Sequence, residues 1–358
     1  MPSSKPLHIL ITGVGGPTPR SFARAIKEIG NYKTYRLFGT DINKYAIGLY
    51  QHELFEQCFL TPRSAEPRYW DFTKQLILEQ GIEMAVILPE TEVIAWSRQQ
   101  ATGTLPCKAL IPDLALAETL VDKAVLTRLL APHGLVPVSV DVDPENPKLK
   151  SEIEDKLKYP FWVRSATGSS GLGSFKVHSF RDLQNWLTIN PDVTHFLASK
   201  YLSGRNLACK LLYFEGELVR AAVGERVNYI MAKTSPSGIT GNTSFGRLLN
   251  DPAVFEISKR AMELVFESTG SRKHGFFTVD LKEDETGKPF ITEINIRHVA
   301  FTSAFAAGGA NLCEDTIRLL NEDPSFDRSF KLYEFEEGLI FLRDVDAMPI
   351  IMKESDLL

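Results

Sequence analysis

Short apolar runs alternate with amphipathic stretches along the first third of the chain. Three runs have the length and β-branched content of buried strands: His8–Thr12 (HILIT), Tyr35–Asp41 (YRLFGTD) and Met84–Leu88 (MAVIL). Apolar residues recur at helical spacing over Arg20–Ile29 and Tyr69–Gln80. Strands that alternate with helices indicate a parallel, doubly wound sheet, which we expect to end near Asp113.

The middle of the chain predicts a smaller α+β unit. Helical spacing covers Leu114–His133, and the stretch VDVDPENPK, with two prolines and no periodicity, is expected to be a loop. The unit itself is predicted from three strands and a helix: Tyr159–Arg164, Phe175–His178 and Thr194–Leu202 for the strands, and Phe180–Leu187 for the helix. A glycine loop, TGSSGLGS, joins the first two of these strands.

The last part reads as a larger antiparallel α+β domain. Its expected elements are a hairpin (Leu207–Phe214 and Glu217–Val223), a long polar and mobile loop (Val227–Phe245), a helix (Pro252–Thr269), a second hairpin and a helix (Asn311–Asn321). A tail from Lys331 carries one more apolar strand, GLIFLR. We therefore expect domains over residues 1–113, 114–202 and 203–330, followed by a tail over 331–358.

The second hairpin carries polar residues in an apolar, β-branched setting. In FITEINIR, Glu293 and Asn295 are two residues apart, so both point to one side of a strand, and Arg297 continues on that side. A turn at KEDETGKP brings Asp280, at the end of GFFTVDL, beside them. Two carboxylates and an amide oxygen suit Mg²⁺ with bound phosphates. The alternative is a solvated hairpin face with an ion pair to Arg297.

Two glycine runs precede this hairpin. Gly13–Gly16 follows a strand and opens a helix, as in a dinucleotide-binding turn, but Thr18 occupies the third glycine position, so a tight strand-to-helix turn is the alternative. Asp41 ends the next strand, where it would hold a ribose, orient a small substrate or cap a turn. Gly168–Gly173 links two strands, and its N–H groups, with Arg164 just before them, could fold over phosphates.

Composition narrows the class of protein. The net charge of -5 argues against nucleic acid as the main partner. The 4 cysteines form no CxxC pair, which indicates neither a zinc site nor a disulfide framework and fits a reducing compartment. The sequence has no signal peptide and no apolar run of membrane-spanning length, so we expect a cytoplasmic enzyme without a membrane partner.

The order of these motifs resembles the ATP-grasp superfamily over roughly residues 5–325. A DK-helix-G-x-x-P segment precedes strand, basic residue, glycine loop and strand, then a YLSG strand end, and last D…ExNxR. The stretch ILITGVGG…YRLFGTDINKYAIGLY resembles the members related to the carbamoyl-phosphate synthase large subunit, which are typically stand-alone carboxylate–amine ligases. The resemblance implies a Rossmann-like domain followed by an ATP-grasp fold, with a small α+β lid and a larger α+β catalytic domain.

The resemblance also implies roles for individual residues. The expected contacts to the phosphates of ATP are Lys123, Arg164, Gly168, Ser169, Ser170 and Gly171. Lys200, Tyr201 and Leu202 would meet adenine, while Asp280, Glu293 and Asn295 would bind Mg²⁺, or Mn²⁺ in its place. Arg297 would stabilise the transferring phosphoryl group, with Lys123 and Arg164 as further catalytic cations. For the organic substrate we expect Gly15, Gly16, Asp41, Arg226 and Arg297.

The implied reaction is ADP-forming ligation of a carboxylate to an amine, through an acyl phosphate. The partners would be small molecules, with amino acids among the candidates, and a homodimer is one candidate assembly. Ser199, Asn206 and Lys210 depart from the family pattern, so contacts to the ribose are expected to be rearranged. Two alternatives remain: a non-catalytic ATP-grasp relative that binds only nucleotide or partners, and an NAD-dependent oxidoreductase that uses Gly13 and Asp41.

Overall fold

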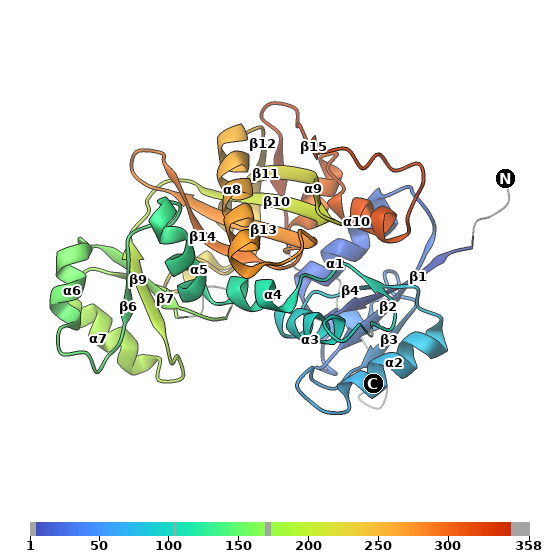
Figure 1. Ribbon diagram of the computed structural model, residues 1–358, viewed down its shortest axis with the longest axis horizontal. Helices are drawn as coiled ribbons and strands as arrows, with labels where there is room; N and C mark the ends of the chain where they lie inside the picture. Colours follow the sequence, from blue (N-terminus) through green and yellow to red (C-terminus); the bar gives the residue numbers. More distant parts are fainter. Residues whose placement is uncertain (1–4, 104, 169–172, 345–358) are drawn as a thin grey trace.

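The computed structural model describes residues 5–103, 105–168 and 173–344, whose strands form three sheets (Figure 1). Ser169, Ser170 and Gly171, expected in the phosphate flap, lie outside the described residues. No helix in the described ranges is long and apolar enough to cross a membrane.

The first sheet is parallel, with strand order β3-β2-β1-β4-β5. Its strands are β1 (Leu7–Thr12), β2 (Tyr35–Asp41), β3 (Gln57–Leu60), β4 (Met84–Val86) and β5 (Lys108–Ala109). The helical segments between them are α1 (Pro17–Arg24), η1 (Ala25–Ile29), η2 (Ile47–Tyr50), α2 (Tyr69–Gln80) and α3 (Glu90–Gln100). Thr12 and Thr40 are partners in the register of β1 and β2, so the turn after Thr12 and the end of β2 meet at one sheet edge.

Two helices lead out of this sheet: α4 (Leu114–Val121) and α5 (Lys123–Leu130), followed by the short η3 (Ala131–His133). The prediction of a single helix over Leu114–His133 is therefore wrong, because the helix is interrupted at Asp122. This residue has an extended backbone, and its carboxylate accepts hydrogen bonds from the N–H groups of Ala124 (2.9 Å) and Val125 (3.0 Å). An aspartate N-cap starts a new helix, which places Lys123 at its first turn.

The second sheet is antiparallel, with order β6-β9-β7-β8, and is called the lid below together with its two helices. The elements are β6 (Ser139–Val142), α6 (Leu149–Lys156), β7 (Phe161–Ser165), β8 (Phe175–Val177), α7 (Phe180–Ile189) and β9 (Phe196–Lys200). The expected loop VDVDPENPK thus begins as a strand. Val140 and Val142 alternate into the lid core while their backbone pairs with β9.

The third sheet has the order β14-β13-β10-β11-β12-β16, and β15 pairs with β11. Its strands are β10 (Asn206–Phe214), β11 (Glu217–Tyr229), β12 (Thr243–Leu249), β13 (Gly275–Glu283), β14 (Pro289–Asn295), β15 (Lys331–Leu332) and β16 (Ile340–Leu342). The expected loop 227–245 is shorter, at residues 230–242, because β11 and β12 pair at its two ends; η4 (Ala232–Thr234) lies within it. Part of the expected tail joins this sheet through β15 and β16.

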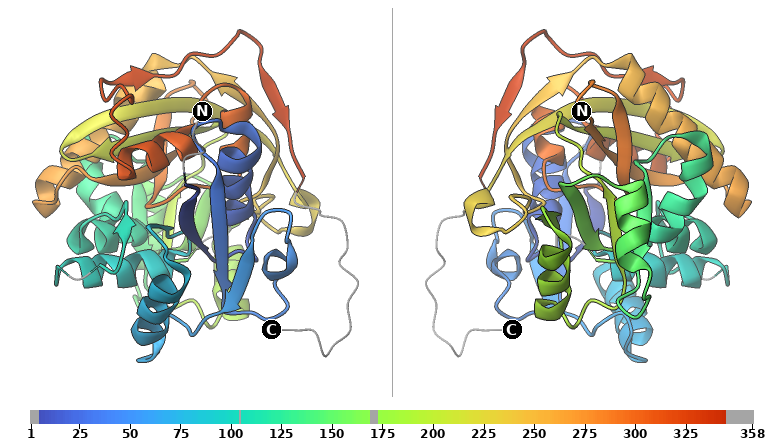
Figure 2. Two further views of the ribbon diagram at one scale, coloured as in Figure 1. Left: turned by 90° about the vertical axis from the view of Figure 1, so that its right-hand side faces the viewer. Right: turned by 90° about the vertical axis from the view of Figure 1, so that its left-hand side faces the viewer.

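Both faces of the third sheet are covered. The helix α8 (Pro252–Thr269) packs on one face, together with α4, and the short helices α9 (Thr302–Ala307) and α10 (Leu312–Leu320) on the other. The α1–η1 segment of the first domain packs on α9 and α10. Their contact includes a hydrogen bond from Ser21 Oγ to Ser303 Oγ (2.8 Å). Along the longest axis the lid and the parallel sheet lie at opposite ends, and end-on views place the large sheet above the parallel one (Figures 1 and 2).

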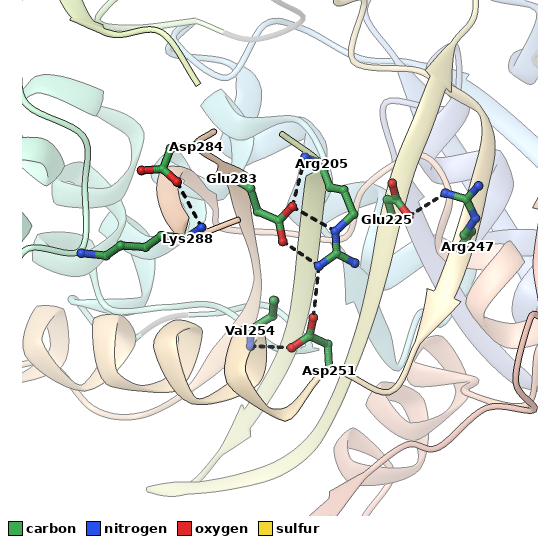
Figure 3. Close-up of polar contacts among 8 residues, drawn as sticks. All are labelled: Arg205, Glu225, Arg247, Asp251, Val254, Glu283, Asp284 and Lys288. Carbon is green, nitrogen blue, oxygen red and sulfur yellow. Dashed lines mark hydrogen bonds and ion pairs between the residues drawn. The ribbon is translucent and has the colours of Figure 1, made fainter. Parts of the chain in front are cut away.

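An ion-pair cluster fixes the end of the large sheet on its α8 face (Figure 3). The guanidinium of Arg205 donates to both carboxylate oxygens of Glu283, at 2.9 and 2.6 Å, and lies 3.7 Å from Asp251, the N-cap of α8. These contacts join β10, β13 and α8. Asp280 and Lys282 alternate with Glu283 along β13, and both line the cavity described in the next subsection.

Candidate active site

The polar residues of the β13–β14 hairpin converge as expected from their spacing. Asp280 and Glu293 are direct partners in the antiparallel register. The amide nitrogen of Asn295 donates to Asp280 Oδ2 (3.1 Å) and to Glu293 Oε1 (3.4 Å). Burial and the neighbouring Glu293 raise the pKa of Asp280 above its usual value, although the charge of Arg226 opposes this effect. Two carboxylates held this close in a desolvated place require a cation.

The chemistry of these donors fits a magnesium ion. All three side chains offer oxygen atoms, which Mg²⁺ prefers. The Asn295 amide donates to both carboxylates here; rotating it by half a turn would present its oxygen to the same point. Among the described residues, no three His, Cys, Asp or Glu side chains form a metal-binding group.

Cations surround this carboxylate pair. The ammonium of Lys123 lies 3.6 Å from Glu293 Oε2 and donates to the carbonyl oxygen of Gly168 (2.6 Å). Arg226 Nη2 donates to Asp280 Oδ1 at 2.6 Å. Burial alone would raise the pKa of Glu293, but three cations outweigh it and hold the pKa below its usual value: Lys123, Arg164 and Arg226. The centre therefore holds more positive than negative side chains.

Three of the guanidinium groups are incompletely paired. The Nε atoms of Arg164, Arg226 and Arg297 are buried and have no hydrogen-bond partner among the described residues. A buried N–H without an acceptor is costly, and native proteins rarely leave one unpaired. Three such donors around one point indicate a site that is completed by an anion, such as the phosphates of a nucleotide.

A cavity of about 340 Å³ lies between the lid and the large sheet. Trp162 and Arg164 of β7 and the segment Lys200–Leu202 line its lid side. The ring centroids of Trp162 and Tyr201 are 6.4 Å apart, and the Lys176 ammonium nitrogen lies 4.1 Å from the centroid of the Tyr201 ring. Leu207, Leu281 and the stem of Lys282 line the sheet side. This end suits a flat heteroaromatic ring, and the other end reaches Asp280 and Glu293.

A second cavity, of about 280 Å³, lies between the first domain and the large sheet. It is lined by Gly13 and residues 16–19 of the turn after β1, by Leu88 and Pro89 after β4, and by Val299 and Ala300. Four lining residues are shared by both cavities: Arg226, Gly241, Asp280 and Glu293. Of these two cavities, Arg297 lines the second and not the first. The two cavities therefore meet at the candidate metal ligands.

Lys200 lines the first cavity but already has protein partners. Its ammonium lies 3.3 Å from Asp284 and 3.0 Å from Glu285, both at the β13–β14 turn. This contact joins the end of lid strand β9 to the large sheet. Of the expected nucleotide residues, Lys123, Arg164, Gly168 and Lys200–Leu202 thus gather around one cavity.

The residues of the first glycine turn bind one another. The Gly15 N–H donates to Asp41 Oδ2 (2.8 Å), and the Gly16 N–H donates to the Gly13 carbonyl (3.0 Å). Asp41 also accepts from the Asn43 N–H (2.9 Å). These hydrogen bonds shape the turn. Gly16 lines the second cavity, whereas Gly15 and Asp41 line neither of the two cavities, and the contacts of all three residues with the substrate stay a prediction. The same hydrogen bonds leave Asp41 poorly suited to hold the ribose of NAD.

The sequence-based prediction missed two residues near the site. Trp162 is two positions from Arg164 on β7, so strand periodicity alone would have placed it on the same face. Glu90, at the start of α3, is half-buried; burial raises its pKa, against the opposing charges of Arg297 and Lys123. No local pattern indicates that this part of the first domain faces the centre.

Lys210 lies outside both cavities. Of the three residues that depart from the family pattern, Ser199 and Asn206 line the first cavity, but Lys210 does not. It is fully buried, and its ammonium lies 4.7 Å from the Phe301 ring centroid and 4.9 Å from that of Phe305. Burial lowers its pKa to about 7.

Three features together define a class of fold: a parallel sheet docked on a larger antiparallel sheet, a small antiparallel lid, and a cavity between lid and large sheet. This is a Rossmann-like domain followed by an ATP-grasp fold, as the sequence predicted, and the solved structures below share it. No family model matches the sequence, and no curated protein matches it.

Solved structures match most of the chain. N5-carboxyaminoimidazole synthetase from Staphylococcus aureus, complexed with ADP, has a TM-score of 0.66 at 15% identity and covers 95% of this chain and 81% of its own. The biotin carboxylase domain dimer of Hydrogenobacter thermophilus 2-oxoglutarate carboxylase, in complex with MgADP, ADP and bicarbonate, has a TM-score of 0.65 at 15% identity, with coverages of 91% and 72%. L-amino acid ligase from Bacillus licheniformis has a TM-score of 0.61 at 17% identity, with coverages of 88% and 75%.

Proposed function

We propose that this protein is an ATP-dependent ligase that activates a substrate carboxylate as an acyl phosphate and transfers the acyl group to an amine, releasing ADP and phosphate. The observation that carries the proposal is a set of buried guanidinium groups where the two cavities meet, around the Asp280–Glu293 pair. The Nε donors of Arg164, Arg226 and Arg297 have no acceptor within the part of the chain that the structure describes. Similar folds crystallised with ADP, in one case with magnesium, support ATP and Mg²⁺ as the reactant and ion.

In this proposal the first cavity holds ATP. The adenine would lie near Trp162, Tyr201 and Leu202, with the phosphates directed toward Lys123 and Arg164. Asp280, Glu293 and Asn295 would hold Mg²⁺, which neutralises charge on the phosphates when it is bound. Phosphoryl transfer needs positioned charge more than covalent help from the protein, which fits a site built from fixed cations.

The second cavity would hold the carboxylate. A carboxylate oxygen bonds to the γ-phosphorus while the bond from that phosphorus to the oxygen of ADP breaks. The amine nitrogen then attacks the acyl carbon, phosphate leaves with its electron pair, and the nitrogen releases a proton. Arg297 lines this cavity beside the shared carboxylates, so its guanidinium would offset the charge of the transferred group. We further propose that the protein is one of the ligases related to the carbamoyl-phosphate synthase large subunit.

Product identification tests this function. The protein is incubated with MgATP, pooled carboxylic acids and pooled amines, and the nucleotide products are identified by phosphorus NMR. We expect ADP and phosphate, formed only when a carboxylic acid is present. AMP with pyrophosphate as the stoichiometric products would contradict the acyl-phosphate route.

A further inference from the structure

The second cavity has an unusual chemical lining for a site that receives a charged organic molecule. Six of its described residues present only aliphatic groups: Pro17, Pro19, Leu88, Pro89, Val299 and Ala300. Pro17 and Pro19 also have no N–H, so the first turn of α1 offers few donors to a ligand. The rest of the wall away from the arginines and the candidate metal ligands is uncharged: Thr18, Asn242 and three glycines complete it.

The charged groups of the cavity are concentrated at one end. Arg226 and Arg297 supply two positive charges there, which suits the carboxylate of a substrate. Among the described lining residues, the acidic side chains are Asp280 and Glu293, both at the candidate metal site. Glu90, which follows the lining residue Pro89, lies close enough to Arg297 for their charges to interact, but it does not line the cavity.

An amino acid would bring an ammonium group next to its carboxylate. That ammonium would enter beside Arg226 and Arg297, with Asp280 and Glu293 already engaged by cations. Burying an ammonium without a counter-charge costs several kcal/mol, and nearby guanidinium groups would repel it. The lining thus favours a molecule that is anionic at one end and apolar elsewhere.

We propose that the acid activated in this cavity is an apolar carboxylic acid without an amino group on the carbon next to the carboxylate. This inference rests on the ligase function proposed above and names its substrate class. A cavity of 280 Å³ suits an acid of about ten non-hydrogen atoms. Amino acids then remain candidates for the amine but not for the activated acid.

Hydroxylamine provides the test, because it traps an acyl phosphate as a hydroxamate without needing the natural amine. Two matched pairs differ only in the α-ammonium: hexanoate against norleucine, and 3-phenylpropanoate against phenylalanine. With MgATP we expect kcat/KM for hydroxamate formation to be at least about tenfold higher for the acid without the ammonium in each pair. Equal or faster reaction of the amino acids would overturn the inference and leave the ligase function intact. No ADP and no hydroxamate with any of the four acids would instead contradict the ligase function.

A charge introduced into the wall tests the location. Asn242 lines the second cavity, and Asn242→Asp adds a carboxylate with almost no change in shape. We expect the preference for hexanoate over norleucine to fall by about fivefold or more, since the ammonium gains a counter-charge. Asn228→Asp is the matched control, because Asn228 is exposed on β11 and lines neither of the two cavities. This variant should prefer hexanoate over norleucine by the same factor as the wild type. An unchanged preference in Asn242→Asp, or an equal shift in both variants, would overturn the placement of the acid in this cavity.

Discussion

Glu293 is the residue on which most of the local positive charge converges. Lys123, Arg164 and Arg226 together hold its pKa below the usual value despite burial. We predict that Glu293→Gln lowers kcat for ADP formation by about 100-fold or more, because it removes one of two carboxylates from the proposed magnesium site. The measurement is the steady-state rate of ADP release over a range of Mg²⁺ concentrations.

The control for this variant is Glu263→Gln, an exposed side chain on α8 paired with Lys273 at 3.5 Å. It makes the same chemical change outside both cavities and should retain the wild-type kcat. A Glu293→Gln protein with wild-type kcat at low Mg²⁺ would refute the metal role. Loss of the folded state in the same variant would show that Glu293 is needed for structure.

A second buried carboxylate is expected to affect stability and not catalysis. Glu92 accepts a hydrogen bond from the Tyr69 hydroxyl (2.7 Å), which in turn accepts from Trp96 Nε1 (3.0 Å). Burial raises the pKa of Glu92 to about 7, although hydrogen bonds from Tyr69 and Thr12 oppose the rise. The Glu92 carboxyl therefore binds its proton more tightly in the folded state than in the unfolded chain. The contribution of this protonated carboxyl to stability is complete below the pKa that Glu92 has in the unfolded chain, and it is lost as the pH rises through about 7.

The variant Glu92→Gln stays neutral at every pH and should escape this loss. Relative to the wild type, we predict that its free energy of unfolding improves by on the order of 2 kcal/mol between pH 4.5 and pH 8. Denaturant unfolding of both proteins at these two pH values measures the difference. A difference between the two proteins that does not change with pH would show that Glu92 is ionised in the folded state throughout.

The residues that were predictable from the sequence are those governed by strand geometry. Glu293 and Asn295 share a side of β14 because of the two-residue period, and the hairpin brings Asp280 close to them. The exact pairing of Asp280 with Glu293 was not predictable, because it depends on a register shift between Asp280 and Leu281; a regular hairpin would pair Asp280 with Thr292. Glu90 was not predictable, since its place depends on how the parallel sheet docks on the large sheet. The engagement of Asp41 by Gly15 depends in the same way on the pairing of β1 with β2 and the turn after β1.

The predicted limits of helices agree with the structure where a single sequence pattern determined the prediction. The limits of α2 and α8 agree with the hydrophobic periodicity and, for α8, with an Asp-Pro start and a glycine end. The errors occurred where two signals competed. Asp122 is a good N-cap, but it lies inside an otherwise helical pattern. Val140 and Val142 alternate as in a strand, and this strand pairs with β9, but the prolines that follow Val142 favoured a loop.

The N-terminus of α8 gives a prediction for a whole element. Asp251 caps the helix through the Val254 N–H (3.1 Å) and also lies beside Arg205 (Figure 3). We predict that Asp251→Ala lowers the free energy of unfolding by about 1 to 2 kcal/mol, from the loss of the cap. Asp251→Asn keeps the capping oxygen and loses only a half-exposed ion pair, so it should cost less than about 1 kcal/mol. Equal losses in both variants, measured by urea unfolding, would assign the effect to the ion pair and not to the cap.

On the scale of the whole molecule, the first domain and the large sheet form one packed body. Ser21 bonds Ser303, and the Asn311 amide donates to the Ala25 carbonyl (2.8 Å), so the second cavity has fixed walls on both sides. The lid has its own core and reaches the rest through few polar contacts, among them Lys200 with Asp284. The lid is therefore the part that a bound nucleotide should stabilise most.

Hydrogen exchange measures this difference. We predict that MgADP slows amide exchange in lid strands β7 and β9, which line the first cavity, while exchange in β1 and β4 of the first domain stays the same. Equal slowing in all four strands would indicate a global stabilisation. No slowing in β7 and β9 at saturating MgADP would place the nucleotide outside the lid cavity.

The central claim is that phosphate is transferred to a carboxylate before the acyl group moves. Oxygen-18 in the substrate carboxylate tests it directly, because phosphate expelled from an acyl phosphate keeps one carboxylate oxygen. With a labelled acid, MgATP and an amine, we predict one labelled oxygen in each phosphate formed together with ADP, read by the isotope shift in phosphorus NMR. Unlabelled phosphate from a reaction that consumes the acid, or label in AMP, would contradict the proposed mechanism.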